Sequence, residues 1–196
     1  MTSAPAAHHV AARQYIARYG AVAIGLHWLL AAAIVASLGV GLYMHELPLS
    51  PLKAKLINWH KWAGITILAL SAVRLLWRLA HRPPDLPAAT LAAMAAWQQR
   101  SYRATHRLMY ALFFAVPLAG WAYSSAAGFQ VVWFGVVPLP DFVAVDEELA
   151  ELLKGLHQLL AFGLGALVMV HVAAALKHQF VDRDGLMQRM LPTGGR

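Results

Sequence analysis

The chain has 196 residues, of which 60% are hydrophobic and only 13% are charged, whereas soluble domains are about a quarter charged. This composition excludes an ordinary soluble domain and indicates an integral membrane protein. The chain has no cysteine, which excludes disulfides, iron–sulfur clusters and thiolate metal sites. The net charge of +7 does not indicate a nucleic-acid-binding protein, because the basic residues gather at the ends of apolar segments.

Four apolar segments follow one another along the chain, over residues 21–43, 57–79, 106–123 and 156–177. Most of them have the length that a helix needs to cross the roughly 30 Å hydrocarbon core of a bilayer. The third segment is the shortest, and it contains Pro117, which should kink the helix or end it early. The short connections between the segments predict an all-α, antiparallel four-helix bundle within the membrane.

The basic residues predict how the bundle is oriented. Twelve of the sixteen lie before the first segment, around the connection between the second and third, or after the fourth. Because cytoplasmic loops are enriched in lysine and arginine, both termini should be cytoplasmic, and the acidic loop 124–154 should lie outside. We therefore expect a cytoplasmic N-terminal tail over 1–20, a transmembrane domain over 21–180 and a cytoplasmic C-terminal tail over 181–196.

Histidines recur at two depths of this predicted bundle. The fourth segment carries His157 and His171, which are about 21 Å apart along a helix axis and within roughly 40° of one face. His27 in the first segment matches the depth of His171, and His60 in the second matches the depth of His157. Ionisable side chains inside a membrane span are energetically costly and mark functional sites.

Two depth-matched histidine pairs fit two haems, with each iron held between two imidazoles. Copper and zinc also accept imidazole, but two imidazoles leave a zinc ion two ligands short, and no span offers a carboxylate at the right depth. An isolated histidine would more often be a helix-packing residue. The pairing favours haem ligation, and the outer loop should lie on the membrane surface and cover the outer haem.

Other residues fall near these two levels. Gly41 should face the outer pair and let a macrocycle approach, although small residues also serve ordinary helix packing. Arg74 should reach the inner level, where it can bind a propionate, take part in quinone binding or proton transfer, or simply anchor the span end. His106 and His178 lie near the cytoplasmic interface and are candidates for contact with a quinone or for proton transfer, the alternative being solvated surface residues.

Five stretches carry a resemblance to a known family: GLHWLL at His27, NWHKWAG at His60, VRLLWRL at Arg74, GLHQLLA at His157, and HVAAALKHQFVDRDGLMQRMLP from His171 onward. Over about residues 19–192 the chain resembles the bacterial cytochrome b561 family. The likeness is strongest to its short four-helix di-haem members that act as superoxide oxidases. Cytochrome b subunits of membrane hydrogenases share much of the pattern.

The resemblance implies that His27 and His171 ligate a cytoplasmic-side haem b, and that His60 and His157 ligate a periplasmic-side haem b. It also implies a multi-pass enzyme of the bacterial inner membrane. Such an enzyme oxidises superoxide to dioxygen at the periplasmic face and passes the electrons through two haems to ubiquinone.

Three lysines near the expected outer haem, Lys53, Lys55 and Lys61, can attract the superoxide anion or contact lipid headgroups. The main alternative is an electron-transfer subunit that links a periplasmic redox partner, either hydrogenase-like or a soluble carrier, to the quinone pool. A metal or haem transporter is a further alternative, but no span has the broken helix and polar midplane site of transporters. The sequence leaves open the direction of electron flow, the quinone site, and whether the chain pairs with itself.

Overall fold

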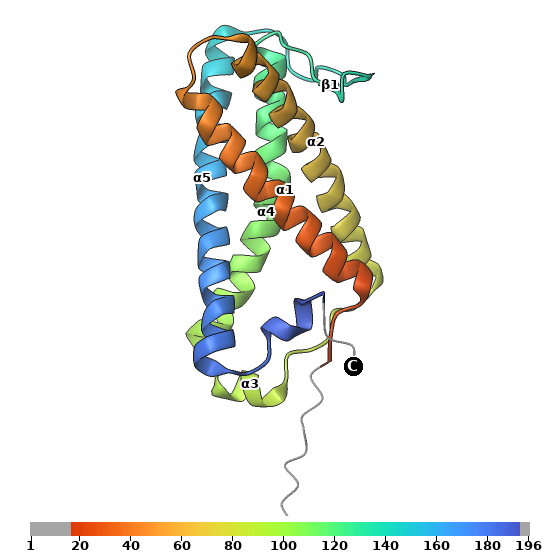
Figure 1. The fold of residues 1–196 in the computed structure, drawn as a ribbon, viewed down its shortest axis with the longest axis vertical. Helices are drawn as coiled ribbons and strands as arrows, with labels where there is room; N and C mark the ends of the chain where they lie inside the picture. Colours follow the sequence, from red (N-terminus) through yellow and green to blue (C-terminus); the bar gives the residue numbers. More distant parts are fainter. Residues whose placement is uncertain (1–16, 193–196) are drawn as a thin grey trace, which may run out of the picture.

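Four long apolar helices form most of the structure (Figure 1). The computed structural model describes residues 17–192, and within that range four helices are long and apolar enough to cross a membrane. They are α1 (Ala21–Glu46), α2 (Pro51–Ala80), α4 (Ala96–Ala126) and α5 (Glu147–Lys177). Each exceeds the roughly 20 residues that span the hydrocarbon core. The prediction of an all-α four-helix membrane protein is therefore confirmed.

Two of the long helices, α2 and α5, begin where a side chain accepts a hydrogen bond from an unpaired backbone amide. At the start of α2 the Ser50 side chain accepts from the Lys53 amide, and Pro51 occupies the first turn, where its missing N–H costs nothing. At the start of α5 the Asp146 carboxylate accepts from the Leu149 amide at 2.9 Å. These caps fix where the chain re-enters the bundle on the side of the outer loop.

Helix α4 runs through Pro117 and continues to Ala126, so the helix does not end early at the proline. Proline is tolerated inside membrane helices because neighbouring helices can satisfy the backbone groups that it disturbs. Here the carbonyl of Val116 lies 3.0 Å from the Nδ1 atom of His157 on α5. The backbone beside the proline thus contacts one of the predicted site residues.

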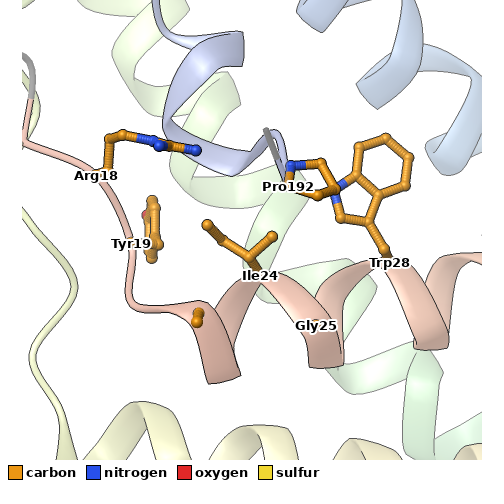
Figure 2. Close-up of a pocket in the computed structure, with 7 residues that line it drawn as sticks. Arg18, Tyr19, Ile24, Gly25, Trp28 and Pro192 are labelled. Carbon is orange, nitrogen blue, oxygen red and sulfur yellow. The ribbon is translucent and has the colours of Figure 1, made fainter. Parts of the chain in front are cut away.

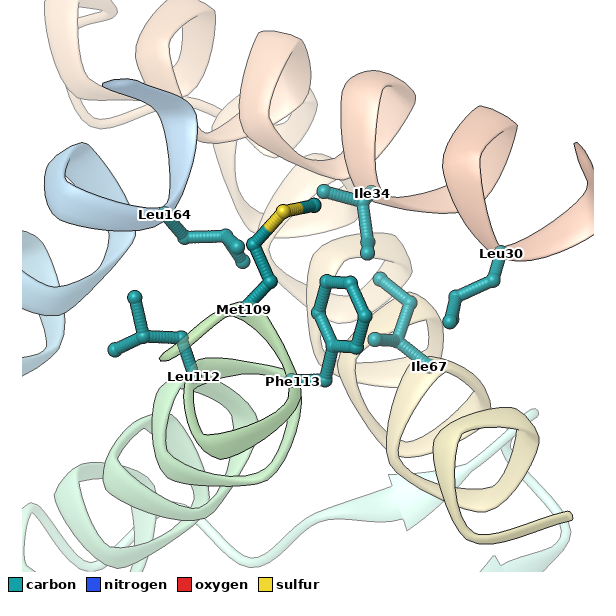
Figure 3. Close-up of a cluster of buried hydrophobic side chains, with 7 residues drawn as sticks. All are labelled: Leu30, Ile34, Ile67, Met109, Leu112, Phe113 and Leu164. Atoms are coloured by element: carbon teal, nitrogen blue, oxygen red, sulfur yellow. The ribbon is translucent and has the colours of Figure 1, made fainter. Parts of the chain in front are cut away.

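The core lies between the two histidine levels. Helix α4 packs along α5, α1 packs along α2, and α2 also packs against α4. Figure 3 shows the buried side chains at the centre of the bundle, which come from all four long helices: Leu30, Ile34, Ile67, Met109, Leu112, Phe113 and Leu164. Most other apolar side chains of the helices point outward, as expected where lipid replaces water as the surrounding medium.

The outer loop folds into a short hairpin, which the sequence did not predict. Strand β1 (Val132–Trp133) pairs antiparallel with β2 (Val137–Pro138), and the hairpin lies beside α2 in Figure 1. The Trp62 indole donates to the carbonyl of Val132 at 2.6 Å, and the Trp133 indole donates to the Thr66 hydroxyl at 3.2 Å. The loop is therefore held against the second helix.

The segment after α5 folds back under the bundle. A π-helical turn (His178–Asp182) and a 3₁₀ turn (Met187–Met190) follow the last long helix, and a short helix α3 (Ala88–Ala93) lies in the connection between α2 and α4. Arg189 is only 4% exposed. Its guanidinium donates to the carbonyls of Ala17, Pro84 and Asp85, so it ties together three segments of this end.

Candidate functional site

The outer histidine pair joins α2 to α5. The ring centroids of His60 and His157 are 6.0 Å apart, and the rings are nearly perpendicular. The Nδ1 atom of His60 donates to the Ser37 carbonyl at 3.1 Å, and that of His157 donates to the Val116 carbonyl at 3.0 Å. With the proton on Nδ1, each ring keeps its Nε2 lone pair for a ligand, which is the arrangement found for metal-binding histidines.

The inner pair joins α1 to α5. The ring centroids of His27 and His171 are 6.2 Å apart. His106 from α4 lies close by, with its ring centroid 5.3 Å from that of His171 and its Nδ1 atom 2.8 Å from the Tyr102 carbonyl. The structure thus brings three imidazoles together at this level.

Arg74 also reaches the inner level. One guanidinium nitrogen donates to the Ala23 carbonyl at 3.1 Å, and the other lies 3.3 Å from the Nδ1 atom of His27. Arginine can only donate, so this contact requires His27 to accept through Nδ1. The tautomer of His27 therefore differs from those of His60 and His157.

The spacing within each pair suits an ion bound between two opposite imidazoles. A metal about 2 Å from each coordinating nitrogen leaves the two ring centroids roughly 6 Å apart. Among the described residues, one group of three or more close histidine, aspartate or glutamate ligands occurs, and it includes neither pair. Each pair offers two imidazole ligands. The third imidazole of the inner level, His106, lies 5.3 Å from His171 between ring centroids and belongs to no close ligand group of the described residues. This donor set fits haem iron, whose remaining ligands come from the macrocycle, better than four-coordinate zinc.

Two glycines leave room beside the outer pair. A Cβ atom added at Gly41 would lie 3.3 Å from Cε1 of His60, and one added at Gly120 would lie 3.0 Å from Cε1 and Nδ1 of His157. A side chain at either position would press on an imidazole. Gly41 was expected here from its spacing to His27, whereas Gly120 was missed, because the sequence does not show that this face of α4 lies against His157.

A cavity of about 610 Å³ surrounds the outer pair and is lined by residues of all four long helices. Its lining includes the lysines Lys53, Lys61 and Lys154 together with Glu46, so positive side chains outnumber negative ones. Lys55, predicted with the other two, instead places its ammonium group 4.8 Å above the Trp59 ring and does not line the cavity. Lys154 was missed, although it lies three residues before His157 and therefore close to the same helix face.

The imidazole of His178 contacts two carboxylates, and among the described residues no contact joins it to the inner histidines. Its Nδ1 atom is 2.7 Å from the Asp184 carboxylate and 3.1 Å from that of Asp182. Asp182 in turn accepts two hydrogen bonds from Lys177. Of the cytoplasmic-side candidates, Arg74 and His106 therefore lie at the inner pair.

Comparison with known proteins gives a family for this arrangement. The model of the prokaryotic cytochrome b561 family matches residues 18–193. The chain belongs to this family. It is therefore a membrane electron-transfer protein of an oxidoreductase family that carries b-type haem, and its four apolar helices make it a multi-pass inner-membrane protein.

Curated relatives share about a third of the sequence. Cytochrome b561 homolog 2 of Escherichia coli strain K12 is 31% identical over 175 residues, which cover 89% of this chain and 91% of the relative. The probable superoxide oxidase CybB of Yersinia pestis is 30% identical over 179 residues, covering 89% and 96%. Cytochrome b561 homolog 1 of Escherichia coli is 30% identical over 135 residues. The family prediction is thus confirmed.

Proposed function

We propose that this cytochrome b561 binds two haems, oxidises superoxide to dioxygen at the periplasmic face, and passes the electrons to ubiquinone. The observation that carries the proposal is that two pairs of imidazoles lie at different levels of one bundle. The ring centroids are 6.0 Å apart in the outer pair and 6.2 Å apart in the inner pair. The name of the Yersinia pestis relative, a probable superoxide oxidase at 30% identity, supports the choice of reaction.

In this proposal His60 and His157 hold the outer haem, and His27 and His171 hold the inner one. Bound haem supplies an iron that accepts and gives one electron at a time. The protein orients the ligands: the carbonyls of Ser37 and Val116 accept the Nδ1 protons of the outer pair, which fixes the ring planes and makes the imidazoles better donors.

Arg74 serves the inner haem as a propionate ligand. A histidine that coordinates through Nε2 carries its proton on Nδ1 and cannot accept a hydrogen bond there. The contact of Arg74 with Nδ1 of His27 is therefore incompatible with ligation by His27. A propionate carboxylate would give the guanidinium a charged acceptor instead, and such charge-assisted bonds are stronger than a bond to a neutral ring.

The outer cavity admits superoxide. The substrate is an anion, and Lys53, Lys61 and Lys154 line the cavity that contains the outer pair. Lys154 is paired with Glu151 at 3.1 Å, so Lys53 and Lys61 are the main source of positive charge. A concave site with an excess of one charge raises the encounter rate of an oppositely charged substrate. Each superoxide that gives up one electron leaves as dioxygen, so no side chain needs to form a covalent intermediate.

The centre of the bundle separates the two levels. The buried cluster around Phe113 and Leu164 places a layer of apolar side chains between the histidine pairs. Electrons can cross this short apolar layer, whereas ions and protons are held back by the cost of entering it. We further propose that both termini are cytoplasmic and that residues 21–180 form the haem-binding domain, with tails over 1–20 and 181–196. Residues 1–16 and 193–196 of these tails lie outside the described residues.

A spectroscopic titration of the purified protein tests the proposal. We expect two b-type haems per chain, reduced by an enzymatic superoxide source and reoxidised by a short-chain ubiquinone. Superoxide dismutase added first should abolish the reduction. Two haems that superoxide leaves oxidised would move the electron donor to a periplasmic protein partner, and one haem per chain would overturn the assignment of the two pairs.

A further inference from the structure

A second pocket lies at the other end of the bundle, between the start of α1 and the C-terminal segment. Its volume is about 370 Å³. Figure 2 shows the residues that line it: Arg18, Tyr19, Ala21, Ile24, Gly25, Trp28 and Pro192. None of these residues was assigned a role by the sequence analysis, and none belongs to either histidine pair.

This pocket is one aromatic ring away from the inner histidine pair. The Trp28 indole that lines it packs edge-on against the His27 ring, with ring centroids 5.5 Å apart. The indole is held in place because its Nε1 atom donates to the Met190 carbonyl at 2.7 Å. A molecule in the pocket therefore contacts the same side chain that contacts a proposed ligand of the inner haem.

The lining combines apolar surface with hydrogen-bond donors, which suits a flat, weakly polar ring. Ile24, Gly25 and Trp28 supply the apolar surface, and Arg18 and Tyr19 supply N–H and O–H groups of the kind that bind carbonyl oxygens. One guanidinium nitrogen of Arg18 already donates to the Leu191 carbonyl, which holds this side chain against the C-terminal segment. Gly25 and Trp28 are both exposed on the outside of α1, within a helix long enough to span the membrane. A ring with an apolar tail can thus enter sideways from the bilayer.

We propose that this pocket binds the head group of the quinone acceptor, with Trp28 between the quinone and His27. The inference rests on the proposed function and gives its acceptor a location. One quinone takes two electrons and two protons to become the quinol. Two superoxide ions supply the electrons as they become dioxygen, and water on the cytoplasmic side supplies the protons.

Filling the pocket from Gly25 gives the sharpest test. An added Cβ at Gly25 meets nothing within 4 Å, so Gly25→Leu should place its side chain in the slot without disturbing the helix. Gly39→Leu is the matched control, because Gly39 lies on the same helix, has the same free space, and lines neither this pocket nor the outer cavity. Both variants should keep the wild-type haem content and haem spectra.

In this measurement the haems are reduced chemically, so the result does not depend on superoxide as the electron donor. Anaerobic protein reduced with dithionite and freed of excess reductant is mixed with a short-chain ubiquinone, and haem reoxidation is followed in a stopped-flow instrument. In Gly25→Leu we expect reoxidation at sub-saturating quinone to slow at least about tenfold, equivalent to roughly 1.4 kcal/mol. Gly39→Leu should react at the wild-type rate.

A photoreactive azido-ubiquinone locates the site independently of turnover. Adducts should fall within residues 18–28 in the wild type and in Gly39→Leu, and should be lost in Gly25→Leu. Wild-type reoxidation in Gly25→Leu, adducts elsewhere, or labelling displaced by anionic phospholipid rather than by ubiquinone would each overturn the site. If superoxide fails to reduce the haems but the quinone results hold, the proposed donor is wrong and the quinone site stands.

Discussion

At the scale of single residues, the two histidine pairs differ in how far they are prepared for a metal. In the outer pair both Nδ1 protons already have carbonyl acceptors, so the two rings need little rearrangement to bind iron through Nε2. In the inner pair the guanidinium of Arg74 contacts His27 Nδ1 and must turn away first. We therefore expect the outer site to bind haem more tightly than the inner site.

Removing one imidazole tests the ligand assignment. We expect His157→Ala to lower the haem content from two per chain to one, because an iron with a single axial imidazole loses half of its protein ligands. Haem is quantified after extraction and compared with protein concentration. His81→Ala is the control, since His81 stacks on Trp77 away from both pairs. Two haems retained in His157→Ala would contradict the outer pair.

Gly120→Ala tests whether the bundle sets the orientation of an imidazole. The new methyl group would lie 3.0 Å from the His157 ring, closer than carbon atoms pack, so the ring must rotate or shift. We expect altered electron paramagnetic resonance g-values for one haem and unchanged values for the other. Gly155→Ala, where an added Cβ meets nothing within 4 Å, should leave both signals unchanged. Identical spectra for the two variants would remove Gly120 from the site.

The lysines around the outer cavity should control the encounter with superoxide. We expect Lys53→Gln combined with Lys61→Gln to slow haem reduction by superoxide several-fold at low salt, and salt to shrink the difference as it screens the charges. Lys55→Gln should have little effect, because Lys55 lies over Trp59 outside the cavity. Rates come from pulse radiolysis at two ionic strengths. An equal loss in both variants would indicate a general surface-charge effect.

The residues of the site were predictable to the extent that they follow helical spacing. The two histidine pairs and Gly41 lie on regular helices, so their depth and face follow from counting residues. Gly120 and Lys154 escaped because their importance depends on which helix faces which, and that is decided by tertiary packing. The tautomer of His27 also depends on a partner 47 positions away in the chain.

At the scale of the elements, hydropathy located the spans but not the helix ends. Helix α4 begins at Ala96, ten residues before the predicted span 106–123, because a polar stretch outside the bilayer can remain helical when its backbone bonds stay internal. The hairpin at Val132 could not be predicted, since it is held in place by Trp62 and Thr66 of α2. The spacing of apolar residues does not reveal hydrogen bonds between segments that are far apart in the sequence.

The C-terminal 3₁₀ turn depends on one buried guanidinium. Arg189→Met removes the donor for the carbonyls of Ala17, Pro84 and Asp85, and unpaired buried polar groups cost about 1–3 kcal/mol each. We expect a lower melting temperature in detergent and faster trypsin cleavage at Arg183. Arg183→Gln, whose side chain makes one long bond at the surface, should melt as the wild type does. Equal melting of the two variants would show that the buried contacts contribute nothing.

At the scale of the whole molecule, charge decides orientation. Twelve of the sixteen basic residues lie before the first span, around the connection between the second and third spans, or after the fourth, and this side should face the cytoplasm. A green fluorescent protein fused after residue 196 should therefore fluoresce in cells. Alkaline phosphatase inserted at residue 140 should be active, since it is active only in the periplasm. The reverse pattern would place the superoxide-accessible cavity on the wrong side.

The C-terminal turn that contains Arg189 also supplies Met190, and this residue bears on the order in which the protein is assembled. Trp28, in the first helix to leave the ribosome, takes its hydrogen-bond acceptor from Met190, which is translated after all four spans. The proposed quinone pocket is therefore walled on one side by residues 190–192. If the quinone binds there, this wall is complete only once synthesis has passed Pro192, so the acceptor site would be the last part of the protein to form.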